Sequence, residues 1–430
     1  MNDDCKRVGG VRRSGAAKKP VEAPPGAQSP WVQLRTVTDH PFIYRKMIRG
    51  VDEAARAGDV VTVYGRGGAF LGRGLYNPRS QIQVRVLTHD DRPVDVTFWR
   101  ERLEQAVELR RRLRLDEVTD AYRLVHAEGD GLSGLIVERY ADCLVFELFA
   151  LGMVQRHEEL AAGLKAILGP PTCSDRPDKA RPTWEVFLRA DTRIEQLEGF
   201  RMSGVVNVSD QSAGRRSVVV REHGVRYRVD VREGHKTGFF CDQRDNRLRF
   251  ARLCQDATVL DLCCYTGGFS LCAKQIGGAR EVTGVELDEA AVALARENAN
   301  LNQLRADFVY ADAFTYMRQM LANERTFDAV VLDPPKLATY RDQREEALRK
   351  YHDLNHLAVR MVRPGGVLLT CSCSGLISSS AFGDVVHRAG RQAKRFLQQF
   401  DQTAAAADHP VMTNCPESAY LKALWFRVLK

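Results

Sequence analysis

No stretch of this 430-residue sequence contains about 18 consecutive apolar residues, the length that a membrane-spanning helix requires. The first 30 residues also lack the apolar core of a secretory signal peptide. They are rich in Gly, Pro, Ala, Lys and Arg, which is typical of a segment that does not fold alone. We therefore expect no membrane association, and a disordered basic arm over residues 1–30 that is either solvated or in weak contact with RNA.

The cysteines do not form a disulfide framework or a zinc pattern. There are eleven, an odd number, they are scattered along the chain, and none forms a C-x-x-C pair. Neither Cys263 with Cys264 nor Cys371 with Cys373 has a histidine close by in the sequence. This pattern predicts free thiols in a reducing compartment, the cytoplasm, and no bound metal.

The composition is that of a soluble globular protein, with 44% hydrophobic and 27% charged residues. At about 150 residues per domain, the length predicts two or three domains. The formal net charge of +8 permits a polyanionic partner such as nucleic acid, but does not require one.

The N-terminal third contains short β-rich runs at residues 60–64, 69–75 and 82–87, separated by Gly, Asn and Pro. Such spacing predicts a small β-barrel or meander, which we place at residues 31–97. Its surface carries many cations, which form either a solvated face or an RNA-binding face: Arg45, Lys46, Arg49, Arg66, Arg73, Arg79 and Arg85.

A central α/β domain is predicted over residues 98–230. It starts with a charged helix at residues 98–115 whose periodicity is helical. Gly129, Gly131 and Gly134 formally match the dinucleotide fingerprint G-x-G-x-x-G, but a β-branched run follows where that motif needs a helix. We therefore interpret residues 129–134 as a turn before a β-hairpin, with a further turn between strands at residues 222–224.

From about residue 256 strands alternate regularly with helices, which predicts βαβ units and a doubly wound sheet in a domain over residues 231–430. The last strand follows a turn region and is expected to run antiparallel. Predicted strands occupy residues 257–262, 281–286, 307–311, 327–333, 366–371 and 423–429.

Acidic residues close four of these strands in order, as Asp261, Glu286, Asp312 and Asp333. In open α/β sheets ligands bind outside the carboxyl ends of the strands, and an acid after the second strand can hold both ribose hydroxyls. Gly267 and Gly268 follow the first strand, where they let the backbone approach a ligand closely. The pattern predicts a nucleoside-type cofactor, although neither a dinucleotide fingerprint nor a phosphate-binding P-loop occurs at this turn.

The turn matches class I S-adenosylmethionine-dependent methyltransferases. Residues 32–430 resemble the bacterial large-subunit ribosomal RNA cytosine-5 methyltransferases that carry an N-terminal PUA domain. The motifs that carry the resemblance are "AEGDGLSGLIVERY", "GHKTGFFCDQRDNR", "LDLCCYTGGFSLCA", "VVLDPPKLA", "SCSG" and "DHPVMTNCPESAYLK".

The resemblance implies a PUA-like RNA-binding domain, a central α/β domain and a C-terminal Rossmann-like domain with a seven-stranded doubly wound sheet. It implies S-adenosylmethionine as cofactor and 23S ribosomal RNA as the partner, and a homodimer is possible within it. It also implies cofactor-binding roles for Asp261, Tyr265, Thr266, Gly267, Gly268, Phe269, Glu286, Asp312, Ala313 and Asp333.

C5 of cytosine is a poor nucleophile, and a thiolate that adds to C6 makes it reactive. Cys371 and Cys373 end a strand predicted to lie beside the one that ends at Asp333, which could hydrogen-bond the N3 and N4 edge of the base. Alternate strand residues share a face, so periodicity cannot choose between the two thiols. Position near the strand end and the "SCSG" resemblance favour Cys373, with Asp333 as the second catalytic residue. We interpret Cys263, Cys264 and Cys272 as buried small hydrophobic residues.

The motif Asp333-Pro334-Pro335-Lys336 departs from a related group of cytosine-5 methyltransferases, which has a second cysteine after the first proline to release the product. Lys336 also stands where amino-group methyltransferases need an aromatic residue. Lys336 is therefore either a phosphate contact or a surface lysine.

The basic residues Lys236, Arg244, Arg247, Arg249 and Arg252 could bind the RNA backbone or pair with Asp242 and Asp245. The alternatives to a cytosine-5 enzyme are an RNA-binding ribosome-assembly factor, a methyltransferase for another RNA base, and a nicotinamide-dependent oxidoreductase. The predicted RNA contacts are Arg45, Lys46, Lys236, Arg244 and Lys336.

Overall fold

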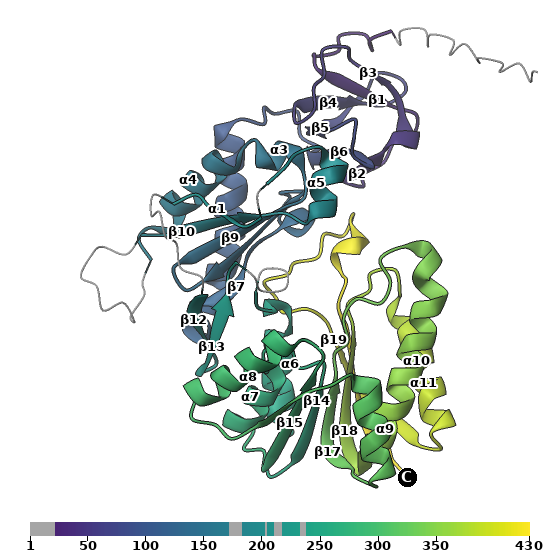
Figure 1. The fold of residues 1–430 in the computed structure, drawn as a ribbon. Coiled ribbons are helices and arrows are strands. Elements are labelled where there is room, and N and C mark those ends of the chain that lie inside the picture. Colours follow the sequence, from purple (N-terminus) through teal and green to yellow (C-terminus); the bar gives the residue numbers. More distant parts are fainter. Residues whose placement is uncertain (1–21, 172–182, 203, 210–216, 233–237) are drawn as a thin grey trace, which may run out of the picture.

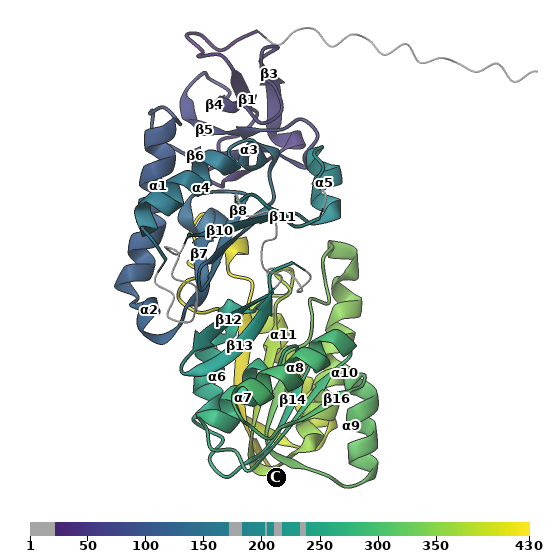
Figure 2. The ribbon, with the colours of Figure 1, turned by 60° about the vertical axis from the view of Figure 1, so that its left-hand side comes forward.

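The computed structural model describes residues 22–171, 183–202, 204–209, 217–232 and 238–430. Three folded parts follow one another, with the N-terminal barrel at one end, an α/β part in the middle and a large C-terminal sheet at the other end (Figures 1 and 2). The expected arm lies outside the described residues over positions 1–21. No helix of the described ranges combines the length and the apolar character needed to cross a membrane.

The N-terminal part is a six-stranded sheet in the order β2-β6-β5-β4-β1-β3. All three strands predicted there are present, and they enclose a small core that includes Val32, Val63 and Val84. Gly74 is required by close packing, since a Cβ there would lie 2.4 Å from the carbonyl oxygen of Arg85. The strands are β1 Trp31–Leu34, β2 Phe42–Tyr44, β3 Ile48–Val51, β4 Val60–Tyr64, β5 Phe70–Tyr76 and β6 Ile82–Thr88.

The central part is a five-stranded sheet in the order β11-β10-β9-β8-β7, and helix α1 (Val96–Arg112) packs on it. Asp95 caps α1 by accepting a hydrogen bond from the Phe98 amide. Strands β8 and β9 pair as the predicted antiparallel hairpin, so the glycine motif before them is no nucleotide loop. The strands are β7 Ala121–His126, β8 Leu135–Tyr140, β9 Cys143–Leu148, β10 Glu185–Arg189 and β11 Val206–Asn207.

The predicted turn at residues 222–224 joins β12 (Ser217–Glu222) and β13 (Val225–Asp230). Apolar side chains of this hairpin share a core cluster with helices of the C-terminal part. One β-bridge, from Thr119 to Glu222, links it to the central part.

The C-terminal part is a seven-stranded sheet in the order β16-β15-β14-β17-β18-β20-β19. The first five strands in this order are parallel, and β20 is antiparallel to β18, as predicted. Sequence analysis missed β19, a mostly exposed and polar edge strand without the apolar run of the central strands. The strands are β14 Thr258–Leu262, β15 Glu281–Glu286, β16 Asp307–Tyr310, β17 Phe327–Leu332, β18 Val362–Ser372, β19 Phe396–Thr403 and β20 Lys422–Leu429.

Helices cover both faces of this sheet, which makes β17 buried at every position (Figure 1). One layer packs on the core cluster that contains Leu260 and Val330, and the other packs on clusters that contain Val259 and Cys264. The first layer is α9 Ala313–Ala322, α10 Arg344–Met361 and α11 Ser379–Gln392; the second is α6 Arg244–Ala251, α7 Gly268–Gln275 and α8 Glu289–Leu301.

The segment of residues 404–421, between β19 and β20, leaves the C-terminal sheet and reaches the other two parts (Figure 1). His40 of the barrel lies 3.0 Å from a carboxylate oxygen of Glu417, and the Asn414 amide donates to the carbonyl of Asp39. Asp408 is buried against the central part, where Arg110 donates to its backbone carbonyl. This connecting segment therefore ties all three parts together.

Candidate active site

A cavity of about 640 Å³ opens at the carboxyl ends of the parallel strands. It receives residues that directly follow β14, β15, β16, β17 and β18, so the strand-end geometry predicted from the sequence is present. The predicted site residues that line it are Tyr265, Thr266, Gly268, Phe269, Glu286, Asp312, Ala313, Asp333, Lys336 and Cys373.

Asp261 and Gly267 do not line the cavity; they lie in the strand and turn behind the residues that do. Asp261 is fully buried, and its Oδ2 accepts hydrogen bonds from the Ser270 amide and hydroxyl at 2.9 and 2.7 Å. Burial raises its pKa to about 6. Gly267 has φ +84°, and a Cβ there would lie 3.0 Å from the Phe308 ring. Both residues hold the tight turn that begins α7.

Glu286 and Asp312 mark the second and third strand ends. The Tyr265 amide donates to Glu286 Oε2 at 2.9 Å, and the Leu287 amide donates to Oε1 at 2.7 Å. Asp312 caps α9 by accepting from the Thr315 amide at 2.9 Å. These backbone contacts fix both carboxylates at the cavity, where they are partly exposed.

Aromatic rings that sequence analysis did not assign to the site form another wall. Phe239 and Phe240 line the cavity, and the Phe240 and Tyr265 rings meet edge to face at 5.0 Å. The Tyr265 hydroxyl donates to the Gly238 carbonyl at 3.4 Å. The only available signal was that Phe239 and Phe240 lie inside the quoted motif "GHKTGFFCDQRDNR".

The structure separates the two cysteines that periodicity could not. Cys371 is fully buried in a core cluster with Val331 and Trp425, and burial raises the pKa of its thiol well above the ordinary value. Cys373 is partly exposed and lines the cavity together with Asp333. Gln243, which sequence analysis did not assign to the site, donates to Asp333 Oδ2 at 2.9 Å.

Of the other cysteines, Cys264 and Cys272 are buried as predicted, but Cys263 is partly exposed and lines the cavity. It has a left-handed backbone, with φ +62°, in the turn after β14. The prediction that Cys263 is a buried core residue is therefore wrong. All nine cysteines of the described ranges are free thiols.

The predicted RNA contacts do not all reach the surface. Arg45 and Lys46 are exposed on the barrel, and Lys336 is exposed at the cavity; Lys236 lies outside the described residues. Arg244 is buried and donates to both carboxylate oxygens of Asp408, at 3.1 and 2.8 Å. The prediction of an RNA contact at Arg244 is wrong, because its guanidinium is buried in an ion pair with Asp408, a residue far away in the sequence.

The alternative prediction for this basic cluster, pairing with Asp242 and Asp245, is confirmed for Arg244 with Asp245. Arg247 and Arg249 pair with acids that were not predicted. Arg244 lies 3.2 Å from Asp245, as proposed from the sequence. Arg247 donates to both carboxylate oxygens of the buried Glu222 at 2.7 Å, and Arg249 pairs with Asp401.

The donor set fits a nucleoside with a charged tail. Two carboxylates stand at successive strand ends, aromatic rings form one wall, and a left-handed glycine opens the turn into α7. A Cβ at Gly268 would approach the Arg247 side chain to 3.0 Å, so the turn is shaped for bare backbone beside the cavity. Oδ1 of the buried Asp261 has no hydrogen-bond partner among the described residues.

Comparisons with known proteins agree with this arrangement. Residues 35–89 match the family described as PUA-like domain, and residues 206–427 match the family described as S-adenosylmethionine-dependent methyltransferase. The protein named Ribosomal RNA large subunit methyltransferase I is 38% identical in Shewanella frigidimarina over 394 residues, covering 90% of this chain and 95% of that protein. The protein of the same name in Aeromonas salmonicida is 39% identical over 393 residues, with the same two coverages.

Solved structures show the same fold. SMU.776, solved in complex with SAH, superposes with a TM-score of 0.75 at 21% identity and covers 90% of this chain and 96% of its own. A SAM-dependent methyltransferase structure from Streptococcus mutans gives a TM-score of 0.75 at 20% identity, covering 92% and 100%. The Rossmann-like architecture and the S-adenosylmethionine cofactor predicted from the sequence are therefore confirmed.

Proposed function

This chain belongs to the family of S-adenosylmethionine-dependent methyltransferases, and from that membership we propose that it forms 5-methylcytidine in large-subunit (23S) ribosomal RNA. The names of its relatives support ribosomal RNA as substrate. The choice of C5 is supported by one observation above all. The cavity holds a partly exposed thiol, Cys373, together with a carboxylate, Asp333, on adjacent strand ends.

We assign the cofactor to the part of the cavity formed by the first three strand ends. In this assignment Glu286 accepts hydrogen bonds from the ribose hydroxyls, and Asp312 accepts one from the exocyclic amine of the adenine. Tyr265, Thr266, Gly268, Phe269 and Ala313 form the surrounding walls, with Asp261 and Gly267 holding the turn behind them. When bound, S-adenosylmethionine supplies an electrophilic methyl group on a sulfonium.

The chemistry of the base falls to Cys373 and Asp333. The thiolate of Cys373 forms a bond to C6 of cytosine while N3 gains a proton, and C5 becomes an enamine-type nucleophile. In the proposed mechanism Asp333, which accepts a hydrogen bond from Gln243, binds the N3 and N4 edge of the base. After C5 is methylated, the C5 proton and the proton gained at N3 pass to solvent and the sulfur–C6 bond breaks, which restores the C5–C6 double bond and the thiolate. No second thiol follows Pro334, so product release differs from that of enzymes with a releasing cysteine.

Release of tritium from RNA labelled at cytidine C5 tests the proposal. Methylation at C5 replaces the C5 hydrogen, so one tritium is expected to enter water for each methyl group transferred. RNA labelled at another position is the control. Methyl transfer without tritium release would show that the enzyme methylates another atom.

Weaker cofactor binding is expected when Glu286 is changed to Gln. The substitution keeps the size of the side chain but removes the charge that would strengthen hydrogen bonds from ribose hydroxyls. A loss of about 1.5–3 kcal/mol corresponds to a Kd for S-adenosylhomocysteine about 10–150-fold higher, measured by calorimetry. Glu289→Gln, an exposed position in the first turn of α8, is the matched control and should bind normally. Equal affinities in both variants would contradict the ribose assignment.

RNA binding is assigned to the exposed cations Arg45 and Lys46 on the barrel and Lys336 at the cavity. Such contacts supply affinity without sequence information, because they meet phosphates. In this proposal one RNA substrate contacts both the barrel and the catalytic cavity.

A further inference from the structure

Lys422, the first residue of β20, is a lysine buried beside the proposed nucleophile. It is only 8% exposed. Its ammonium donates to the carbonyl oxygens of Ser374 and Tyr420, at 2.7 and 2.8 Å. Both acceptors are neutral carbonyls, and no carboxylate is among the groups of the described ranges that shift the pKa of Lys422. Burying a lysine without a carboxylate partner lowers the stability of the folded protein, because the ammonium loses its hydration.

The position of Lys422 is defined by the residues on either side of Cys373. In the antiparallel pairing of β18 with β20, Lys422 stands opposite Ser372. Its ammonium then reaches past this position to the carbonyl of Ser374. Cys373 is the residue between them, and Leu421, which precedes Lys422, lines the same cavity as Cys373. The carbonyls of Ser374 and Tyr420 therefore hold the Lys422 ammonium next to the backbone of Cys373.

We propose that Lys422 is a positioning residue whose ammonium stabilises the thiolate of Cys373 and so sets its reactivity. The thiolate is the nucleophilic form of cysteine, and a nearby cation favours it by an amount that grows as water is excluded. This inference deepens the proposed function and rests on it, since it gives the attacking sulfur its charge partner.

The charge balance around the thiol supports a role for Lys422. Burial, together with the nearby charge of Lys336, lowers the pKa of Lys422 to about 8, although a charge on Cys373 acts in the opposite direction and raises it. Burial raises the pKa of Tyr351 to about 12, so its hydroxyl is neutral near pH 7. Asp333 is an acid and disfavours a thiolate, while Lys336 is exposed to screening by water. Arg247, a second buried cation of the same cavity, is paired with Glu222. Lys422 instead donates to neutral carbonyls and can offset Asp333.

The test is the pH dependence of Cys373 alkylation by iodoacetamide in the full chain, followed by mass spectrometry of the Cys373 peptide. In Lys422→Met the midpoint of this dependence is expected to rise by about one pH unit or more, the effect of losing an opposite charge nearby. Lys422→Arg, which restores the cation, should bring the midpoint back toward the wild-type value. Lys336→Met, which removes the exposed lysine of the same cavity, should shift it less.

An unchanged midpoint in Lys422→Met, or no recovery in Lys422→Arg, overturns the proposal. Binding of S-adenosylhomocysteine identifies folded protein. If Lys422→Met does not bind it, Lys422→Gln, which keeps a donor for the two carbonyls, takes its place with the same expected shift. Alkylation uses neither RNA nor methyl transfer, so the outcome is separable from the proposed function. A Cys373→Ala enzyme that still methylates RNA would refute the nucleophile and leave the Lys422 effect standing.

Discussion

Replacing Cys373 by alanine is expected to lower methyl transfer on the order of 10⁴-fold, while the affinity for S-adenosylhomocysteine stays within about twofold of wild type. The loss is large because, without the sulfur–C6 bond, C5 of cytosine has no route to a nucleophilic form. Cofactor binding persists because the proposed ribose and adenine contacts, Glu286 and Asp312, follow other strands. Single-turnover methylation of RNA and a calorimetric titration measure the two quantities.

Cys371→Ala is the matched control, two residues away on the same strand. Its side chain is buried in a core cluster and does not line the cavity, so its removal costs stability, about 1 kcal/mol, rather than chemistry. Its methylation rate should stay close to wild type at a temperature where the variant is folded. Full activity in Cys373→Ala, or a comparable loss in Cys371→Ala, would contradict the assignment of the nucleophile.

The alternation of strand residues could not predict which of these two cysteines lines the cavity. Strand alternation places residues 371 and 373 on one face, and no local pattern tells which of them lies beyond the last paired residue. The pairing of β18 with β20 ends at Ser372, so Cys373 lies beyond the last paired residue and lines the cavity. The acids at strand ends were predictable because parallel strands bring their carboxyl ends to one edge whatever the details of packing.

Other features depended on contacts between distant segments and could not be predicted. Arg244 has the sequence surroundings of a surface cation, but its partner Asp408 is 164 residues away. The polar edge strand β19 has no hydrophobic alternation, and only its pairing with β20 defines it. Lys422 likewise lies at the start of a strand with no unusual sequence pattern. Only the register of β18 and β20 shows that it is close to Cys373.

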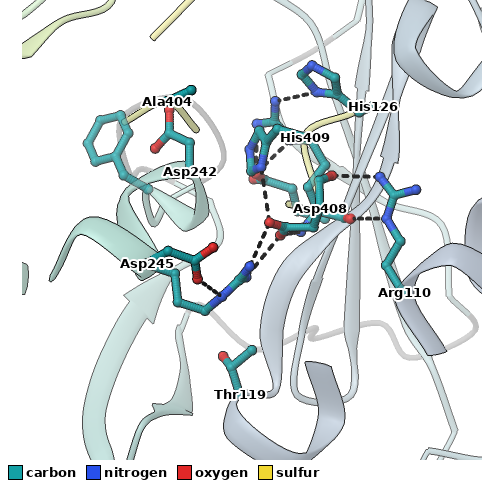
Figure 3. A network of polar contacts seen from close by, with 12 residues as sticks. Arg110, Thr119, His126, Asp242, Asp245, Ala404, Asp408 and His409 are labelled. Carbon is teal, nitrogen blue, oxygen red and sulfur yellow. Dashed lines mark hydrogen bonds and ion pairs between the residues drawn. The ribbon is translucent and has the colours of Figure 1, made fainter. Parts of the chain in front are cut away.

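Asp408 is the centre of the contact between the central and C-terminal parts. Figure 3 shows Asp408 and His409 between Arg110 of α1 and Asp245 of α6. The Asp408 carboxylate accepts from Arg244 and from the Arg123 amide, and its backbone carbonyl accepts from Arg110. The connecting segment ends at Leu421, which lines the cavity, and Lys422 follows as the first residue of β20. One buried carboxylate therefore joins the central part to the strand that borders the active site.

The pKa of Asp408 gives this contact a defined dependence on pH. Burial alone would raise the pKa of Asp408, but His409 and Arg244 lower it by a larger amount. The pKa therefore lies well below the usual value. Because the folded-state pKa is depressed, the stabilisation is fully present above the unfolded-state pKa, which is about 3.9. It is lost as the pH falls below that value toward the folded-state pKa. Between pH 5 and 8 the contribution of Asp408 should not change.

Changing Asp408 to Asn is therefore expected to destabilise the protein by about 3–5 kcal/mol at pH 7, because Arg244 would remain buried without its buried charge partner, with only the exposed Asp245 beside it. Asp245→Asn removes the other carboxylate that pairs with the same arginine, but the Asp245 side chain is 57% exposed, whereas that of Asp408 is 0% exposed. This control should change stability by no more than about 0.5 kcal/mol. Urea unfolding at pH 7 measures the free energy of unfolding of both variants. Equal losses of stability would show that burial does not determine how much each ion pair contributes.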